Sequence, residues 1–214
     1  MRVKVCGMTS LEQILQLDEW GVPFAGMIFY PKSPRYVKKF NINAIDVRRE
    51  KLKINRVGVF VNETLDNILK TVEEWRLDMV QLHGDESPKF CEQVSNHVHT
   101  IKAFRLGADD PVEWKVYPYQ AFTDMFLFDS GTTGATPAYG GTGLKFNWDS
   151  LQKADLRKPF MLSGGIGPDD VAAVKAFAAA QKDMFAVDVN SKFELSPGFK
   201  DMTLIRSFLN ELNA

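Results

Sequence analysis

The chain has 214 residues, 45% of them hydrophobic, and its 26 Lys and Arg residues nearly balance 27 Asp and Glu residues. This composition is typical of a globular protein with a sizeable core, and the balanced charge gives no support for binding to nucleic acid or to an anionic membrane. No apolar run approaches the roughly 20 residues of a membrane span, the N-terminal sequence has no signal-peptide core, and two cysteines make a disulfide scaffold unlikely, so we expect a cytoplasmic protein.

Eight short apolar runs recur along the chain, each followed by a segment of helical or loop character. We expect strands at Val3–Cys6, Phe24–Phe29, Asn55–Val61, Asp78–Leu82, His99–Phe104, Asp124–Asp129, Pro159–Ser163 and Met184–Asp188. This alternation predicts βα units and a parallel sheet. Eight units without a linker favour a single (β/α)8 barrel domain over residues 1–214. A doubly wound open sheet is the alternative, weakened because no G-x-G-x-x-G follows the first strand.

Sequence signals mark several helix starts. Thr9-Ser-Leu-Glu12 has the pattern of a capping box, which predicts a helix capped by Thr9. Thr64 precedes an apolar helix face, and Pro168-Asp-Asp170 places a proline and two acids in a first turn. The last helix has an apolar stripe suited to packing on the sheet, made of Met202, Ile205, Phe208, Leu209 and Leu212.

In such a barrel, the residues that react with a ligand lie at the carboxyl ends of the strands. Cys6 ends the first strand before Gly7, where a thiol could act as a general base, although a lone cysteine is more often a small core residue. Asp129 ends an apolar strand, where burial favours the protonated carboxyl that a general acid needs, with a loop cap as the alternative. We expect Cys6 and Asp129 to border one cavity as an acid–base pair. Cys91 is expected to be a packing residue.

Two further polar residues follow predicted strands. Arg35 lies in a loop with Pro31 and Pro34, where a rigidly held guanidinium could bind a carboxylate or a phosphate, and a solvated surface arginine is an equal alternative. His83 follows the fourth strand, and a lone histidine is more often structural than catalytic. The sequence has neither a Ser-His-Asp arrangement nor the spacing of a metal site.

Two glycine-rich segments follow late strands. Gly131–Gly143 carries five glycines and could fold over a ligand, or could be an ordinary surface connection. Gly164 and Gly165 join a strand directly to a helix start, where backbone N–H groups and the helix dipole favour an anion. Together with Asp188-Val-Asn-Ser191 after the last strand, they match the position at which many barrels bind phosphate.

Seven motifs of this sequence resemble those of the phosphoribosylanthranilate isomerase family, in the family's order and over essentially the whole chain. They are Lys4-Val-Cys-Gly-Met8, Ser33-Pro-Arg-Tyr36, Val80-Gln-Leu-His-Gly84, Leu127-Phe-Asp129, Gly140-Gly-Thr-Gly143, Leu162-Ser-Gly-Gly-Ile166 and Asp188-Val-Asn-Ser191. The first and third motifs are fairly specific, whereas the glycine pairs are not.

The resemblance implies a (β/α)8 barrel that catalyses the third step of tryptophan biosynthesis. In that step N-(5'-phosphoribosyl)anthranilate undergoes an Amadori rearrangement, with no metal and no organic cofactor. The resemblance implies that Cys6 is the general base and that Asp129 is the general acid. If Cys6 is not the base, Asp188 is the next candidate. It also implies substrate-binding positions, with Arg35 on the anthranilate carboxylate, Gly165, Asn190 and Ser191 on the phosphate, and His83, Gly164 and Asp188 nearby.

Two alternative functions remain open at this point. A related sugar-phosphate isomerase of histidine biosynthesis typically has an acid where Cys6 stands, and a non-catalytic phosphate-binding barrel needs no acid–base pair. One departure from the family concerns the phosphate. Many members have Gly-Val-Glu after the last-strand serine, whereas this chain has Ser191-Lys-Phe-Glu194, which leaves open whether Lys192 contacts the phosphate. The resemblance implies a monomer or a homodimer.

Overall fold

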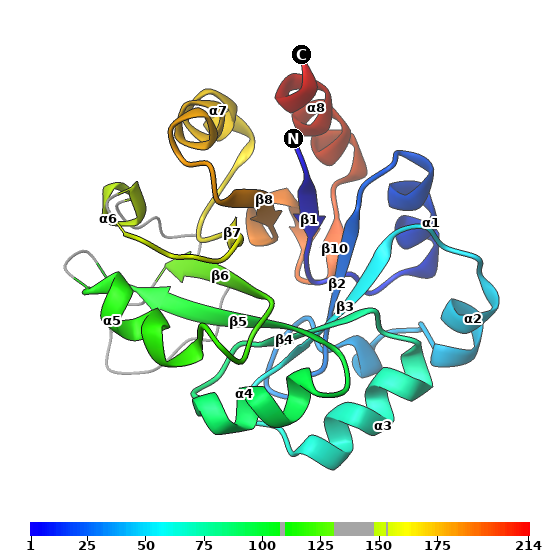
Figure 1. Ribbon diagram of the computed structural model, residues 1–214. Coiled ribbons are helices and arrows are strands. Elements are labelled where there is room, and N and C mark those ends of the chain that lie inside the picture. The colour runs from blue at the N-terminus through cyan, green and yellow to red at the C-terminus, as the bar shows by residue number, and fades with distance from the viewer. Residues whose placement is uncertain (108–109, 131–147, 153) are drawn as a thin grey trace.

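The computed structural model describes residues 1–107, 110–130, 148–152 and 154–214. Eight parallel strands pair in chain order and close into a barrel, because β8 also pairs with β1 (Figure 1). The strands are β1 (Val3–Val5), β2 (Phe24–Ile28), β3 (Asn55–Phe60), β4 (Met79–Leu82), β5 (His99–Leu106), β6 (Met125–Ser130), β7 (Phe160–Leu162) and β8 (Met184–Val189). A short antiparallel hairpin follows β8, formed by β9 (Glu194–Ser196) and β10 (Phe199–Lys200).

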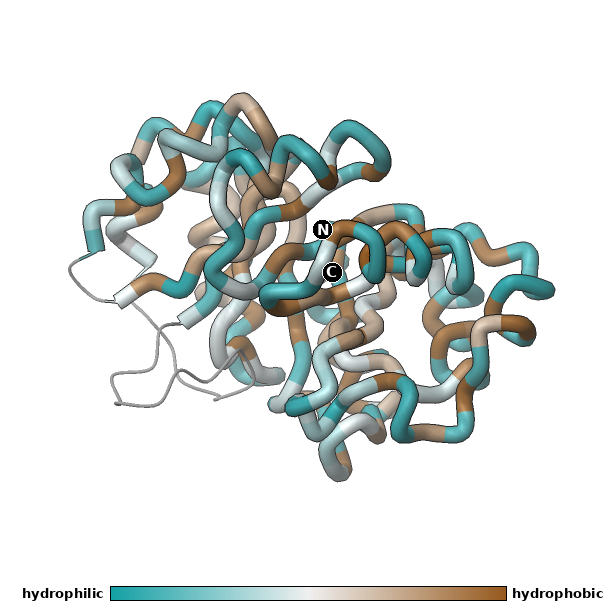
Figure 2. The backbone as a smooth tube through the Cα atoms, turned by 90° about the horizontal axis from the view of Figure 1, so that it is seen from below, coloured by the Kyte–Doolittle hydropathy of each residue, from teal (hydrophilic) through white to brown (hydrophobic). Residues whose placement is uncertain are grey.

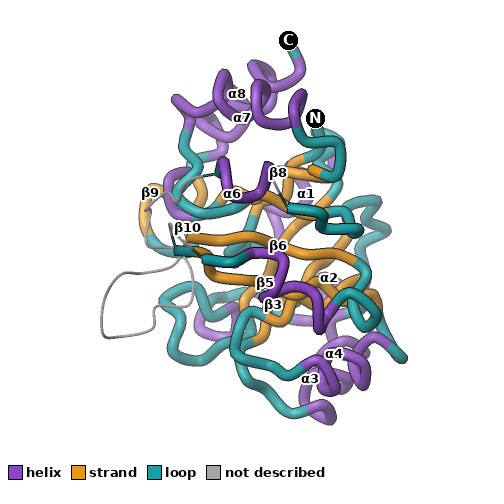
Figure 3. Tube along the Cα trace, turned by 60° about the vertical axis from the view of Figure 1, so that its left-hand side comes forward, coloured by secondary structure: helices purple, strands orange, loops and turns teal. Residues whose placement is uncertain are grey.

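Helices surround the strands on the outside of the barrel (Figure 3). They are α1 (Leu11–Glu19), α2 (Ala44–Arg49), α3 (Leu65–Trp75), α4 (Pro88–Ser95), α5 (Val112–Val116), α6 (Asp149–Gln152), α7 (Val171–Ala180) and α8 (Met202–Asn213). Short 3-10 helices lie at Val37–Lys39, Tyr117–Tyr119, Pro168–Asp170 and Ser191–Phe193. Among the described residues, no helix has the length and apolar character needed to cross a membrane.

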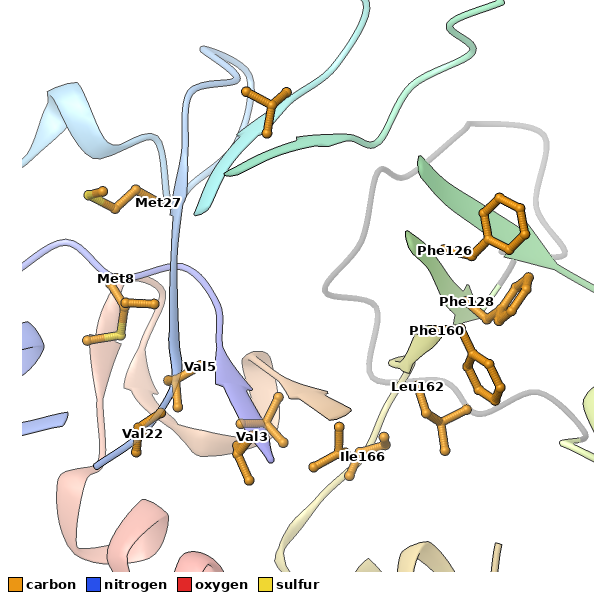
Figure 4. Close-up of a cluster of buried hydrophobic side chains, with 14 of the residues drawn as sticks. Val3, Val5, Met8, Val22, Met27, Phe126, Phe128, Phe160, Leu162 and Ile166 are labelled. Atoms are coloured by element: carbon orange, nitrogen blue, oxygen red, sulfur yellow. The ribbon is translucent and has the colours of Figure 1, made fainter. Parts of the chain in front are cut away.

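Side chains on the strands alternate between the barrel interior and the helices, as expected for extended backbone. Phe24, Ile101 and Leu127 belong to a small buried cluster of the barrel interior. A larger cluster lies between strands and helices, and Figure 4 shows part of it, with Phe126 and Phe160 among its aromatic members. In Figure 2 the colour of the backbone tube changes repeatedly between hydrophobic and hydrophilic along the chain. The interior residues nearest the carboxyl ends of the strands are therefore available to line a pocket.

The structure confirms the predicted (β/α)8 barrel and all eight strands, with ends that differ by one or two residues. Thr64 caps α3 as predicted, accepting a hydrogen bond from Asn67 N at 3.4 Å. The capping box at Thr9 is wrong, because Ser10 caps α1 and the Thr9 hydroxyl donates to the Gly198 carbonyl instead. The hairpin β9–β10 was not predicted, since its strands contain only three and two residues.

The remaining helix predictions have mixed outcomes. The segment Pro168–Asp170 forms a 3-10 helix, and α7 follows it directly. The predicted stripe of α8 is buried at Ile205, Phe208, Leu209 and Leu212. Cys91 is a buried residue of α4, as expected for packing. The segment Gly131–Gly143 lies outside the described residues.

The aromatic cluster beneath the helices yields a test of the fold's stability. Phe126 is fully buried, with ring centroids 5.4 Å from Phe104 and 6.2 Å from Phe128. We expect Phe126→Ala to lower the free energy of unfolding by about 3–5 kcal/mol, since it removes apolar contacts and leaves a cavity. Urea unfolding followed by fluorescence and circular dichroism measures this. Trp114→Ala, at a side chain that is 81% exposed, should change it by less than about 0.5 kcal/mol.

Candidate active site

A pocket of about 330 Å³ opens at the carboxyl ends of the barrel strands. The residues predicted for the site all line it, namely Cys6, Arg35, His83, Asp129, Gly164, Gly165, Asp188, Asn190 and Ser191. Their chain positions are far apart, and the closed barrel brings them together because every parallel strand ends at the same rim. Sequence reasoning missed several polar residues of the lining as individual candidates, among them Tyr30, Gln81 and Ser163.

Cys6 lies directly after β1, with a side chain that is 4% exposed. Its backbone N–H donates to the Val189 carbonyl at 2.9 Å, which continues the pairing of β1 with β8 and fixes the thiol at the rim. Burial raises the pKa of the Cys6 thiol, because a thiolate loses its hydration there, whereas the positive charge of Lys4 acts in the opposite direction. Cys6 is therefore both a buried residue and a pocket residue.

Asp129 is buried on β6 with its two oxygens in different environments. Oδ1 accepts a hydrogen bond from Ser130 N at 2.8 Å, so the interpretation of Asp129 as a loop cap holds for this oxygen. Oδ2 lies 3.3 Å from Nε2 of His83. One oxygen of the carboxyl thus faces the pocket beside an imidazole, while the other fixes the side chain.

The His83 ring is oriented by its neighbour on β4. Gln81 Nε2 lies 2.7 Å from His83 Nδ1, and in this amide orientation it donates to that nitrogen. With that donor, the ring proton of a neutral imidazole is on Nε2, the nitrogen 3.3 Å from Asp129 Oδ2. Nε2 makes no hydrogen bond to the described residues. Gln81 could have been found from the sequence, because it is the polar residue of an otherwise apolar strand that ends at His83.

Arg35 forms a two-pronged ion pair with Glu194 at the pocket mouth. Its Nε lies 2.8 Å from Glu194 Oε1, and its Nη2 lies 2.6 Å from Oε2. The arginine is 8% exposed, so the alternative of a solvated surface residue is wrong. Burial alone would raise the pKa of Glu194, but hydrogen bonds from Arg35 and the charge of Lys200 hold it below its usual value. The pair joins the loop after β2 to the start of β9.

Lys200 completes this network from β10. Its Nζ donates to Glu194 Oε1 at 2.8 Å, to Asn190 Oδ1 at 2.8 Å and to the Asn190 carbonyl at 3.2 Å. The side chain is fully buried, and burial lowers the pKa of Lys200 because it disfavours the charged amine. Glu194 and Lys200 were missed as site residues, since they lie beyond the last predicted strand on the unpredicted hairpin.

Gly7 makes room for this network. Its φ is +76°, a conformation that favours glycine, and a Cβ here would lie 2.8 Å from both Arg35 Cδ and Asn190 Oδ1. Gly7 also directly follows Cys6. A single glycine therefore permits the close approach of the thiol-bearing turn, the loop after β2 and the loop after β8.

The loops after β7 and β8 form the glycine-rich end of the pocket. Gly164 and Gly165 have φ of +89° and +66°, and a Cβ at Gly164 would lie 2.6 Å from Ser130 N. Asn190 and Ser191 line the pocket from the neighbouring loop. Lys192 is exposed and is not among the lining residues.

Both oxygens of Asp188 are already engaged. Oδ1 lies 2.7 Å from Lys4 Nζ, and Oδ2 accepts a hydrogen bond from Ser163 Oγ at 2.9 Å. A carboxylate whose two oxygens are both held by partners within the protein is less free to turn toward a ligand. Asp188 is therefore a poorer candidate for the general base than Cys6.

Proton transfer at the carboxyl end of a (β/α)8 barrel is the class of activity that this geometry defines. A thiol and a carboxyl, both nearly excluded from water, face the same ligand-sized cavity, and basic residues stand at its mouth.

Comparison with known proteins identifies the family. The family model for N-(5'phosphoribosyl)anthranilate (PRA) isomerase matches residues 3–211. The N-(5'-phosphoribosyl)anthranilate isomerases of Parabacteroides distasonis and Thermotoga neapolitana are 35% and 39% identical to this chain, each over 99% of it and over 93% and 98% of their own lengths. The chain belongs to the N-(5'-phosphoribosyl)anthranilate isomerase family, and is an intramolecular aldose–ketose isomerase of tryptophan biosynthesis.

Solved structures agree with this assignment. The phosphoribosyl anthranilate isomerase of Thermotoga maritima has a TM-score of 0.82 and 35% identity, covering 100% of this chain and 98% of that one. Another isomerase structure, in complex with reduced 1-(o-carboxyphenylamino)-1-deoxyribulose 5-phosphate, has a TM-score of 0.80 and 32% identity, with the same coverage. The family predicted from the sequence motifs is thereby confirmed.

The position of Gly7 yields a test with a matched control. Gly7→Ala and Gly21→Ala both place an alanine at positive φ, +76° and +73°, and each should lower the free energy of unfolding by about 1–2 kcal/mol. Only the Gly7 variant also drives a methyl group into Arg35 and Asn190, because nothing lies within 4 Å at Gly21. We expect Gly7→Ala alone to lower kcat/KM of the isomerase, by at least about tenfold. Equal activities of the two variants would contradict this role of Gly7.

Proposed function

We propose that this pocket converts N-(5'-phosphoribosyl)anthranilate to 1-(2-carboxyphenylamino)-1-deoxyribulose 5-phosphate, with Cys6 as the general base and Asp129 as the general acid. The observation that carries the assignment is that a buried thiol, directly after β1, and a buried carboxyl, on β6 three strands away around the barrel, line the same pocket. The other buried carboxyl of the lining, Asp188, is already held by Lys4 and Ser163. A ligand between them is within reach of both groups, as an acid–base isomerisation requires.

The reaction begins at the sugar ring. Asp129 gives a proton to the furanose oxygen while the nitrogen lone pair forms a double bond to C1, so that the C1–O bond breaks and a Schiff base results. The Cys6 thiolate then removes the proton from C2, that electron pair forms the C1–C2 double bond, and the C1–N π pair returns to nitrogen, which gives an enolamine. Tautomerisation places a proton on C1 and leaves the ketone at C2. Each assisted proton transfer contributes about 10²–10⁴-fold to the rate.

Substrate binding divides between two ends of the pocket in this proposal. Arg35 binds the anthranilate carboxylate, supported by its rigid guanidinium and by its place at the mouth. The glycine-rich end takes the phosphate through Gly164, Gly165, Asn190 and Ser191, supported by the polar backbone at the start of the helical segment before α7.

His83 and Asp188 are proposed to contact or organise the sugar between these ends. The Nε2 proton of His83 faces the acid at Asp129 and is available to a substrate hydroxyl. Asp188 is held by Lys4 and Ser163 at the rim of β8, where its charge orders the neighbouring donors. Lys192 is not assigned a phosphate contact, because it is exposed outside the pocket.

We further propose that residues 1–214 form one domain that works in the cytoplasm on this small-molecule substrate, as a monomer or a homodimer. The strands from β1 to β8 and the closing helix α8 support a single domain. Two free cysteines, one of them required as a reactive thiol, suit a reducing compartment. Dimer formation has a precedent in the isomerase of Thermotoga maritima, which is described as dimeric.

Removing the two proton-transfer groups tests the mechanism. We expect Cys6→Ala and Asp129→Asn each to lower kcat by at least about 100-fold, while both still bind the reduced product analogue. Loss of substrate fluorescence in single-turnover and steady-state experiments measures the rate. Cys91→Ala removes the other thiol, which lies in α4 away from the pocket, and should leave kcat within about twofold of the unmodified protein. Full activity of Cys6→Ala would remove Cys6 as the base.

Replacing Arg35 tests the carboxylate subsite. We expect Arg35→Met to raise KM about 10–100-fold, because it removes charge-assisted hydrogen bonds worth about 1.5–3 kcal/mol. Lys38→Met is the control, since Lys38 is an exposed cation next to the same loop but outside the pocket. An unchanged KM in Arg35→Met would place the anthranilate carboxylate elsewhere.

A further inference from the structure

A lysine lies inside the barrel, one layer below the catalytic rim. Lys4 is fully buried in the middle of β1, where it pairs in register with Asp188 of β8. Its Nζ lies 2.7 Å from Asp188 Oδ1. Burying a charge costs several kcal/mol even when it is paired, and paired apolar residues of similar volume often stabilise a fold as well or better. A stable core alone does not require this pair.

Lys4 and Cys6 point to the same side of β1, because side chains two residues apart on an extended chain share a face. Gly26 on the neighbouring strand β2 leaves the space that both side chains approach. A Cβ at Gly26 would lie 2.8 Å from Cys6 Sγ and 3.2 Å from Lys4 Nζ. The ammonium and the sulfur therefore border the same small opening, which a side chain at Gly26 would fill.

The Lys4 ammonium keeps its charge in this environment. Burial disfavours the charge, but the Asp188 carboxylate and the Cys6 sulfur outweigh burial, and the pKa of Lys4 is raised above its ordinary value. Three charged groups act on Cys6 from the elements packed against it. Lys4 of β1 and Lys200 of β10 favour the thiolate, and Asp188 of β8 opposes it less strongly than Lys4 favours it. Across the pocket, Asp129 and His83 face the same cavity.

We propose that Lys4 is a positioning residue for the isomerase, whose ammonium is held by Asp188 beneath Cys6 and supplies the positive charge that stabilises the Cys6 thiolate. This inference rests on the proposed function of Cys6 as the general base. Cys6 and Lys4 then act as a unit, in which Asp188 fixes the ammonium and Gly26 gives it access to the sulfur. Lys4 itself does not touch the substrate, because it lies below the residues that line the pocket.

The sign of the effect follows from the charges. Burial raises the pKa of the Cys6 thiol, and Lys4 lowers it, so removal of Lys4 raises that pKa further. At a given pH below the pKa, the fraction of Cys6 present as thiolate then falls. An isomerase lacking Lys4 loses kcat at neutral pH and regains part of it as the pH rises. If Lys4 had only a structural role, kcat of the variant would not recover as the pH rises.

Thiol alkylation measures the thiolate directly. In a Cys91→Ala background Cys6 is the only thiol, and its rate of reaction with iodoacetamide is followed by mass spectrometry between pH 7 and pH 9. We expect Lys4→Met to slow this reaction at least about tenfold at each pH, as for loss of one adjacent opposite charge. A rate that is unchanged or increased overturns the proposal.

Lys102→Met is the matched control for the loss of a buried lysine. Lys102 is 2% exposed on β5 and paired with Glu86 at 3.0 Å, but it is not among the groups that act on Cys6. The alkylation rate of Cys6 should be unchanged in this variant. An equal slowing in Lys102→Met and Lys4→Met would mean that loss of any buried lysine has the effect, which overturns the proposal.

A second variant covers the case in which Lys4→Met fails to fold, since it leaves Asp188 as an unpaired buried charge. Lys4→Met/Asp188→Asn removes both charges, and the new carboxamide at position 188 has a shape similar to that of the carboxylate it replaces. Because Lys4 acts on Cys6 more strongly than Asp188, we expect alkylation in the double variant to slow as well, but less. A rate equal to or above that of the unmodified site overturns the proposal.

The same preparations separate this inference from the proposed function. If Cys6→Ala keeps its isomerase activity, Cys6 is not the base, and the alkylation rates still decide whether Lys4 stabilises the thiolate. If Cys6→Ala is inactive and Lys4→Met alkylates at the unmodified rate, the function stands and the role of Lys4 is wrong. Slow alkylation together with a kcat that recovers at high pH, at an unchanged KM, supports both.

Discussion

A closed parallel barrel leaves its interior no access to water except at the ends, so every charge inside it must have a partner. This constraint governs the upper layer of the barrel. Lys4 is paired with Asp188, and Asp188 also with Ser163. On the hairpin outside the barrel, the buried Lys200 is likewise paired with Glu194. Below that layer the interior is apolar, with Phe24 and neighbouring residues filling it. Reactive groups are confined to the rim, where pairing and contact with a ligand are both possible.

The network at the mouth makes the short hairpin part of the functional architecture. Arg35 comes from the loop after β2, whereas Glu194 and Lys200 come from β9 and β10, after the last barrel strand. Since β1 lies between β2 and β8 in the barrel, these contacts bridge over the turn that carries Cys6 and Gly7. One set of ion pairs, made by residues that follow the two neighbours of β1, therefore covers the thiol.

The sequence was sufficient for the barrel and for much of the polar lining of the pocket, because both follow from local signals. Cys6 and Asp129 end apolar strands, and strand ends meet at one rim in any barrel of this kind. Glu194 and Lys4 could not be assigned in the same way, because their partners lie 159 and 184 residues away in the chain. The sequence predicts Thr9 as the N-cap of α1, but Ser10 is the cap. The Thr9 hydroxyl donates instead to the carbonyl of Gly198, which lies far away in the chain, in the β9–β10 hairpin.

The ion pairs at the mouth also leave a net charge that bears on the proposed orientation of the substrate. Arg35 and Lys200 share the single carboxylate of Glu194, which leaves one positive charge in excess within this group. A monoanion such as a carboxylate balances that excess, whereas a dianion would reverse it. The glycine-rich loops offer backbone N–H groups of Gly164 and Gly165, which suit an anion of higher charge. In the binding mode proposed above, the charge count therefore favours the substrate carboxylate at Arg35 and the phosphate at the glycine-rich loops.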